Sequence, residues 1–203
     1  MLVINLVRHG EVFNPNHVVY GDLPGFDLSP LGAQEVHQTA KHLAPVPIDV
    51  VLSSPLTRAR HTAAAISLHH DGIPITVDPR LTEFGMYPEW TGLKWDEVER
   101  RFPVELESYL EDATSVPHAA ESVDELFNRM MASVTDAIDD GHRSIVVVGH
   151  QDPIQALRLG LVDRPLSDLR RDPPGHASVT TITSNDGVAF VEDSCWNPEI
   201  TNL

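Results

Sequence analysis

VINLVRHG, residues 3–10, is the stretch that decides the fold. Its first five residues are apolar except for one asparagine, and three of them are β-branched, which predicts a short strand buried on both faces of a sheet. The strand leads directly into Arg8, His9 and Gly10. Similar runs, rich in valine and isoleucine, recur along the chain at 49–54, 75–78, 144–149, 178–184 and 189–193.

Helical segments separate most of these predicted strands. Ser29-Pro30 and Ser54-Pro55 each place an N-capping residue before a proline at the first helical position, and they predict helices ending near residues 43 and 70. A capping box opens a third helix at 122–141, where an apolar residue recurs every fourth position.

The alternation of strands and helices predicts an α/β fold, in which a mostly parallel central sheet lies between two layers of helices. Asn185-Asp186-Gly187 is a strong turn signal, so we expect the last two strands to add an antiparallel edge. The length of 203 residues favours a single domain over the whole chain, 1–203. Residues 11–28 and 79–120 do not fit the alternation, and we interpret them as excursions above one edge of the sheet.

Composition narrows the classes of function. The chain carries 14 basic and 30 acidic side chains, a formal net charge of −16, which disfavours binding to nucleic acid or to an anionic membrane surface. One cysteine, Cys195, cannot form an internal disulfide. The apolar run at the N-terminus has no preceding basic region, and no run reaches the ~20 residues that span a bilayer. These features predict a cytoplasmic protein.

Reactive side chains stand just after four of the predicted strands. Because ligands of an open α/β sheet gather at the carboxyl ends of its strands, we expect these side chains to share one edge. They are Arg8-His9-Gly10, Arg58, Glu83 and His150-Gln151. Gly10 would let the backbone approach a ligand closely or adopt a positive φ.

Two imidazoles, two guanidiniums and one carboxyl group suit the transfer of a phosphoryl group through a histidine. A neutral imidazole is a good nucleophile near pH 7, and guanidiniums bind phosphate oxygens through paired N–H groups. Glu83 would protonate the leaving oxygen and then remove a proton from water. This chemistry needs no metal and no cofactor.

Each of these residues also has a structural interpretation. His9 and His150 could bond backbone carbonyls or cap a helix, and Glu83 competes with several neighbouring carboxylates. Arg58 and Arg60 lie about 200° apart on a helix, so only one can face the sheet edge; Arg58 is nearer the strand. Other histidines, including His176 before the fifth strand, lack the spacing of a helical metal-ligand pair and indicate no metal site.

Four motifs in order resemble those of the histidine phosphatase superfamily, also called phosphoglycerate mutase-like. They are LVRHGE at 6–11, SSPLTRARHTA at 53–63, RLTEF at 80–84 and VVVGHQ at 146–151, and LSPLGAQE at 28–35 fits as well. The resemblance implies that His9 becomes phosphorylated, that Arg8, Arg58 and His150 complete the phosphate pocket, and that Glu83 is the proton donor.

The chain departs from the mutase branch of that family. The asparagine usual six positions beyond the nucleophile is replaced by Pro15, which leaves Asn14 as a candidate substrate contact. Gln151 stands where a small residue is usual, and we expect it to contact the leaving group of the substrate. The segment after Glu83 lacks the basic insertion of mutases. We therefore expect a metal-independent phosphomonoester hydrolase acting on a small phosphorylated metabolite, with a phosphoglycerate mutase and a non-catalytic phospho-ligand-binding protein as alternatives.

Aromatic residues of the two excursions should form the outer wall of the pocket. They are Tyr20, Phe26, Phe84, Tyr87, Trp90 and Trp95. The sequence alone does not specify the phosphoester or an oligomeric state.

Overall fold

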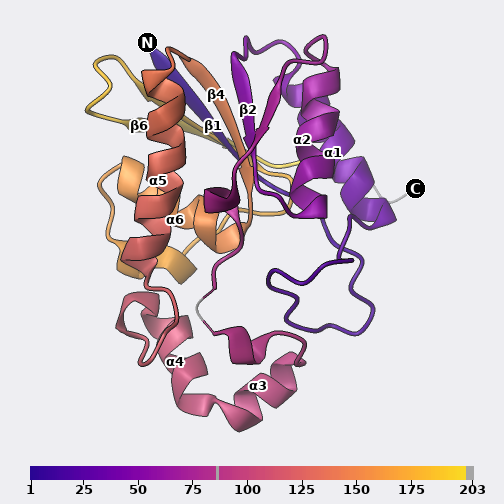
Figure 1. Cartoon of the computed structure of the whole chain (residues 1–203), viewed down its shortest axis with the longest axis vertical. Helices are drawn as coiled ribbons and strands as arrows, with labels where there is room; N and C mark the ends of the chain where they lie inside the picture. Colours follow the sequence, from indigo (N-terminus) through magenta and orange to yellow (C-terminus); the bar gives the residue numbers. More distant parts are fainter. Residues whose placement is uncertain (86, 200–203) are drawn as a thin grey trace.

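The strand at the N-terminus lies near the centre of one six-stranded sheet. The computed structural model describes residues 1–85 and 87–199, so the last four residues of the predicted domain lie outside it. In the sheet the strands follow the order β3-β2-β4-β1-β5-β6 (Figure 1). Their bounds are β1 Leu2–Arg8, β2 Val50–Ser53, β3 Ile75–Val77, β4 Ser144–Gly149, β5 Val179–Ser184 and β6 Val191–Trp196.

Residues along each central strand alternate between two apolar cores, which makes the fold a three-layer α/β sandwich. In β4, Ile145 and Val147 pack with helices α5 (Val123–Asp139) and α6 (Gln151–Leu161). Val146 and Val148 pack with α1 (Pro30–Leu43) and α2 (Thr57–Leu68) on the opposite face (Figure 1). This burial on both faces explains why the strands are continuous apolar runs, as predicted.

The strands meet in a mixed pattern that brings chemical groups to one edge. β1, β2, β3 and β4 run parallel, whereas β5 is antiparallel to both β1 and β6. The start of β5 therefore lies beside the carboxyl end of β1, where Ala177 donates its backbone N–H to the His9 carbonyl at 3.1 Å. The predicted antiparallel pairing of the last two strands is confirmed, although β6 begins two residues later than the predicted strand at 189–193.

Two of the three predicted helix starts are confirmed. The Ser29 side chain accepts from the Gly32 N–H at the start of α1, and Ser122 and Glu125 form the capping box of α5. The prediction that Ser54 caps α2 is wrong, because that helix begins at Thr57 with no side-chain cap. The Ser54 hydroxyl instead lies 2.7 Å from the Nε2 atom of His150.

The two excursions lie against each other beyond the carboxyl edge of the sheet. An isolated bridge joins Val18 to Lys94, and backbone hydrogen bonds join Val19 to residues 92 and 93. The second excursion contains the short helices α3 (Trp95–Arg101) and α4 (Pro103–Glu111), seen in pink at the bottom of Figure 1. Within the described residues, every helix is too short or too polar to cross a bilayer.

Candidate active site

His9 lies at the end of β1 with its two ring nitrogens in different surroundings. Nδ1 is 2.7 Å from the Gly10 carbonyl oxygen, which can only accept, so Nδ1 carries the proton in the neutral ring. Nε2 then accepts from the Nε–H of Arg58 at 3.3 Å. Burial, followed by the charges of Arg58 and Arg8, holds the pKa of His9 well below its usual value. The ring is therefore neutral, and its lone pair lies on Nε2, where Arg58 contacts it.

Arg58 is buried beside His9, and the first excursion covers it. Its side chain is 1% exposed, its NH2 group donates to the Gly21 carbonyl at 2.7 Å, and its guanidinium lies 4.8 Å from the ring centre of Tyr20. Arg60 is exposed, as expected for the other side of α2. The first turn of α2 thus places Arg58 at the sheet edge, and the loop that carries Tyr20 and Gly21 closes over it.

His150 is the second imidazole of the site, at the end of β4. Its ring centre lies 5.1 Å from that of His9 in an edge-on arrangement. It occupies the N-cap position of α6 without capping it, and instead its Nε2 contacts the Ser54 hydroxyl. Its Nδ1 atom is buried with no hydrogen-bond partner among the described residues, and burial followed by the charge of His9 lowers its pKa. An unpartnered ring nitrogen beside the His9 lone pair is suited to contact a bound anion.

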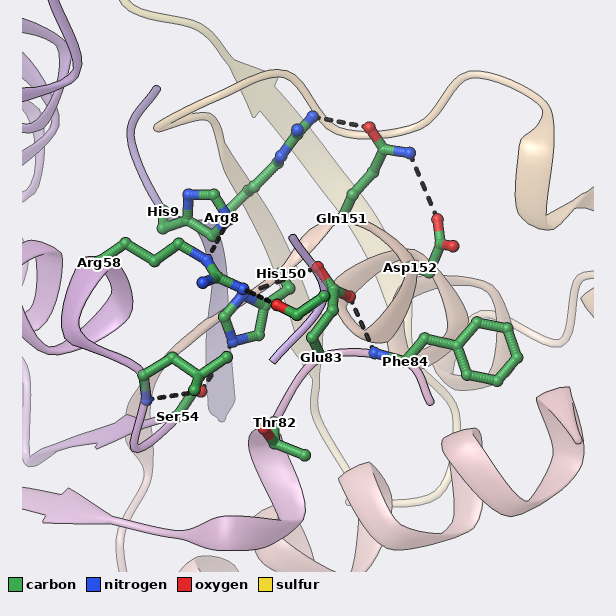
Figure 2. A network of polar contacts seen from close by, with 12 residues as sticks. Arg8, His9, Ser54, Arg58, Thr82, Glu83, Phe84, His150, Gln151 and Asp152 are labelled. Carbon is green, nitrogen blue, oxygen red and sulfur yellow. Dashed lines mark hydrogen bonds and ion pairs between the residues drawn. The ribbon is translucent and has the colours of Figure 1, made fainter. Parts of the chain in front are cut away.

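Glu83 completes the group, although it follows no strand directly. Its Oε2 atom lies 3.8 Å from Nδ1 of His150, and its Oε1 accepts from the Phe84 N–H at 2.9 Å (Figure 2). Arg129 of α5 fixes this segment by donating to the carbonyls of Arg80, Thr82 and Glu83. Burial, followed by the charge of Asp152, raises the pKa of Glu83 to about 7. The carboxyl group is therefore able to give or take a proton near neutral pH.

Arg8 extends from β1 toward the start of α6 and the segment before β5. Its NH1 group donates to the Gln151 Oε1 and Pro174 carbonyl atoms, both at 2.8 Å, and its NH2 group lies 2.8 Å from Nε2 of His176. A guanidinium only donates, so His176 accepts through Nε2. The Nε–H of Arg8 is buried and has no hydrogen-bond partner among the described residues.

Gly10 and Asn14, both predicted to contact substrate, serve local structure here. A Cβ atom on Gly10 would lie 2.6 Å from the Gly32 carbonyl oxygen, so the close approach that requires glycine is to α1, and φ is not positive. The amide of Asn14 bonds both backbone groups of Val18, at 2.8 and 3.2 Å. Asn14 nonetheless lines the cavity beside Arg8.

A cavity of about 360 Å³ opens from Arg8 and Glu83 toward the two excursions. Five of the six aromatic residues predicted to wall the pocket line it, and Tyr109 of α4 joins them. The exception is Phe26, which stacks on Tyr20 with ring centres 5.2 Å apart. The wall is therefore aromatic, as expected.

Three pocket residues were not predicted. The sequence favours a loop histidine at His176, although its place before the fifth strand could also bring it to this edge, and it reaches the edge because β5 runs antiparallel to β1 and begins there. The Tyr109 hydroxyl donates a hydrogen bond to the Asp152 carboxylate at 2.6 Å. These residues are 43 positions apart, and no sequence pattern predicts that they meet. Among the described residues, His9, Glu83 and His150 offer ligand atoms within 4.8 Å of one another, the spacing of a metal site that the sequence did not indicate.

Comparisons with known proteins agree with this architecture. The model of the histidine phosphatase superfamily (branch 1) matches residues 4–196. An uncharacterised protein of Mycobacterium tuberculosis is 36% identical over 181 residues, which are 88% of each chain. The glucosyl-3-phosphoglycerate phosphatase of Mycolicibacterium vanbaalenii is 29% identical over 172 residues, covering 80% of this chain and 75% of that protein.

The solved structure of a mycobacterial glucosyl-3-phosphoglycerate phosphatase in complex with VO3 superposes with a TM-score of 0.85 at 26% identity, covering 98% of this chain and 100% of the other. The named relatives are phosphatases. With the family model matching nearly the whole length, the chain belongs to the histidine phosphatase superfamily, branch 1.

Proposed function

We propose that the protein is a metal-independent phosphomonoesterase that works through a phosphohistidine at His9 and acts on a small phosphorylated metabolite. The observation that carries this proposal is the meeting, at one sheet edge, of a neutral imidazole with an unprotonated Nε2, two guanidiniums and a carboxyl group of pKa about 7. The phosphatase relatives support the reaction class.

In the first step, His9 Nε2 attacks phosphorus as the bond to the ester oxygen breaks. Arg8, Arg58 and His150 contact the non-bridging oxygens, where cationic and N–H donors stabilise charge in the transition state. Glu83 gives its proton to the departing alkoxide. In the second step Glu83 takes a proton from water, water oxygen bonds phosphorus, and the phosphorus–nitrogen bond breaks to release phosphate and regenerate His9.

The same cluster could be considered as a metal site, since His9, Glu83 and His150 have a suitable spacing. The charges argue against that use. Arg58 donates to the very nitrogen that would bind the ion, and burial removes the solvent that would screen a guanidinium from a divalent cation. A phosphate, which is anionic, fits these neighbours better than a cation does.

The test is the covalent intermediate. With 4-nitrophenyl phosphate, rapid acid-free quenching should trap phosphate on the protein at His9, and His9→Asn should abolish both the intermediate and turnover. His37→Asn, a change of the same kind at an exposed histidine of α1, should leave both unchanged. Excess EDTA should not reduce the rate.

Three results would reject the proposal. Turnover by His9→Asn at the normal rate would exclude the nucleophile, and tight phosphate binding without a phosphoprotein would favour the non-catalytic alternative. Phosphoglycerate isomerised faster than it is hydrolysed would favour the mutase instead. The reducing cytoplasm remains the predicted location.

A further inference from the structure

The cavity wall beyond the phosphate-binding groups carries little free charge. Arg8 is the one arginine or lysine among the described residues that line it. Three of the five N–H groups of Arg8 already bond Gln151, Pro174 and His176, and we assign the remaining two to the phosphoryl group. A carboxylate or second phosphate on the leaving group would therefore meet no second arginine or lysine among the described residues of the lining.

The nearest acid in the wall is already paired. Asp152 accepts from the Tyr109 hydroxyl at 2.6 Å, from Arg170 at 3.1 Å and from the Gln151 amide at 3.3 Å. The guanidinium of Arg170 also lies 4.7 Å from the ring centre of Tyr109. Since Arg170 balances the charge of Asp152, this side of the cavity offers an anchor neither for an anion nor for a cation.

The rest of the wall is built from rings around Trp90. The centres of Tyr87, Tyr109 and Trp95 lie 4.7, 5.7 and 6.3 Å from that of Trp90, the first stacked and the others edge-on. These are the offset and edge-on arrangements that a further ring can join with a favourable contact. Trp90 is 5% exposed, and its indole N–H has no partner among the described residues.

The two side-chain amides that line the cavity already have partners. The amide of Asn14 is used by Val18, and the polar atoms of Gln151 are used by Arg8 and Asp152. Each sugar hydroxyl that enters the cavity gives up hydrogen bonds to water, whereas an aromatic ring gives up none and gains contact with the rings around Trp90.

We propose that the physiological substrate is a phosphomonoester of an uncharged alcohol that carries an aromatic ring. The inference rests on the proposed phosphatase function and concerns the same site. It separates this protein from the glucosyl-3-phosphoglycerate phosphatases to which it is similar, whose named substrate carries a carboxylate.

Four primary alkyl phosphates test the proposal on the unaltered protein: ethyl phosphate as reference, 2-phenylethyl phosphate, 2-carboxyethyl phosphate and glucose 6-phosphate. We expect kcat/KM for the phenylethyl ester to exceed that for the ethyl ester by about tenfold, the order of burying one ring. The carboxyethyl ester and the sugar phosphate should be no better than the ethyl ester.

A variant locates the effect in the aromatic wall. Trp95 is 49% exposed, so Trp95→Ala should fold and should lower the phenylethyl-to-ethyl ratio of kcat/KM about threefold or more. Trp196→Ala is the matched control, because Trp196 stacks on His42 outside the cavity and should leave the ratio unchanged.

The outcomes separate the two proposals. Hydrolysis of all four esters with the carboxyethyl ester or glucose 6-phosphate preferred overturns the substrate class while the phosphatase function stands. An unchanged ratio in Trp95→Ala also overturns the substrate class. No hydrolysis of any ester, or of 4-nitrophenyl phosphate, overturns the function and with it the inference.

Discussion

Glu83 sets the pH range in which the proposed reaction runs. Burial and Asp152 raise its pKa to about 7, against the opposing effects of Arg58 and Arg8. The proton that the leaving alkoxide needs is present below that pKa and is lost above it. For ethyl phosphate, we expect kcat to fall as the pH rises from about 7 to about 9.

Glu83→Gln should lower kcat for ethyl phosphate by about 100-fold or more and should remove that decline, since an amide cannot act as the acid. The same variant should lose less kcat with 4-nitrophenyl phosphate, because the leaving group of that ester needs no proton. Glu99→Gln, at an exposed position on α3, serves as the control. A Gln variant with the normal pH profile would show that another group supplies the proton.

His176 is a positioning residue for Arg8. Burial and the charge of Arg8 lower its pKa to about 4, so at neutral pH the ring is uncharged and its Nε2 accepts from the guanidinium. Loss of a hydrogen bond to a charged group costs about 1.5–3 kcal/mol, so His176→Ala should raise KM for ethyl phosphate about tenfold.

Rescue distinguishes this role from simple loss of packing. His176→Gln retains an acceptor and should recover part of the affinity, with kcat changed less than KM in both variants. Steady-state kinetics give both parameters. A drop in kcat alone, or no recovery with glutamine, would show that His176 acts in another way.

At the scale of elements, the start of α1 is pressed against the chain that follows His9. A Cβ atom added to Gly32 would lie 2.0 Å from the Glu11 carbonyl oxygen, a backbone atom that cannot move alone. Gly32→Ala should therefore lower the free energy of unfolding by about 1–3 kcal/mol. Urea denaturation measures it.

Gly85→Ala is the matched control for that change. Gly85 is exposed, its φ is not positive, and its nearest neighbour would be the Glu121 carboxylate at 3.9 Å. It should shift the urea midpoint little. Equal stability of the two alanine variants would mean that α1 moves away from the sheet edge at low cost.

Helix ends show how far local patterns predict elements. Ser29-Pro30 and Ser54-Pro55 are the same signal, yet only the first caps a helix. The Ser54 hydroxyl accepts from the Leu56 N–H at 3.3 Å in the turn before α2, and it also lies 2.7 Å from Nε2 of His150. The second of these partners is 96 residues away in the sequence, and only the folded sheet brings it close to Ser54.

At the scale of the whole molecule, the sheet explains both what was predictable and what was not. Parallel strands end at one edge, so residues that follow β1, β2 and β4 could be placed together from the sequence. The same rule does not place Glu83, because its segment is held by Arg129 and does not directly follow a strand. His176 reaches the site because it precedes β5, which runs antiparallel to β1. Asp152 and Tyr109 meet there because α6 contacts α4.

The net charge of −16 also acts on the molecule as a whole. Folding brings 30 acidic groups closer together than they lie in the unfolded chain, while only 14 basic groups compensate them. Salt screens this repulsion over about 10 Å at 0.1 M. We therefore expect the free energy of unfolding, measured in urea, to rise as NaCl increases from about 10 to about 200 mM.

A charge variant tests whether screening is the cause. Glu107 and Glu111 are exposed on α4, and replacing both by lysine changes the net charge from −16 to −12, because each exchange replaces −1 by +1. The double variant should gain less from salt than the unaltered chain does. If both proteins gained the same free energy of unfolding from salt, screening would not be the cause, because the repulsion to be screened differs between them. The gain would then come from ions bound at a site that both proteins share, such as the pocket of Arg8 and Arg58.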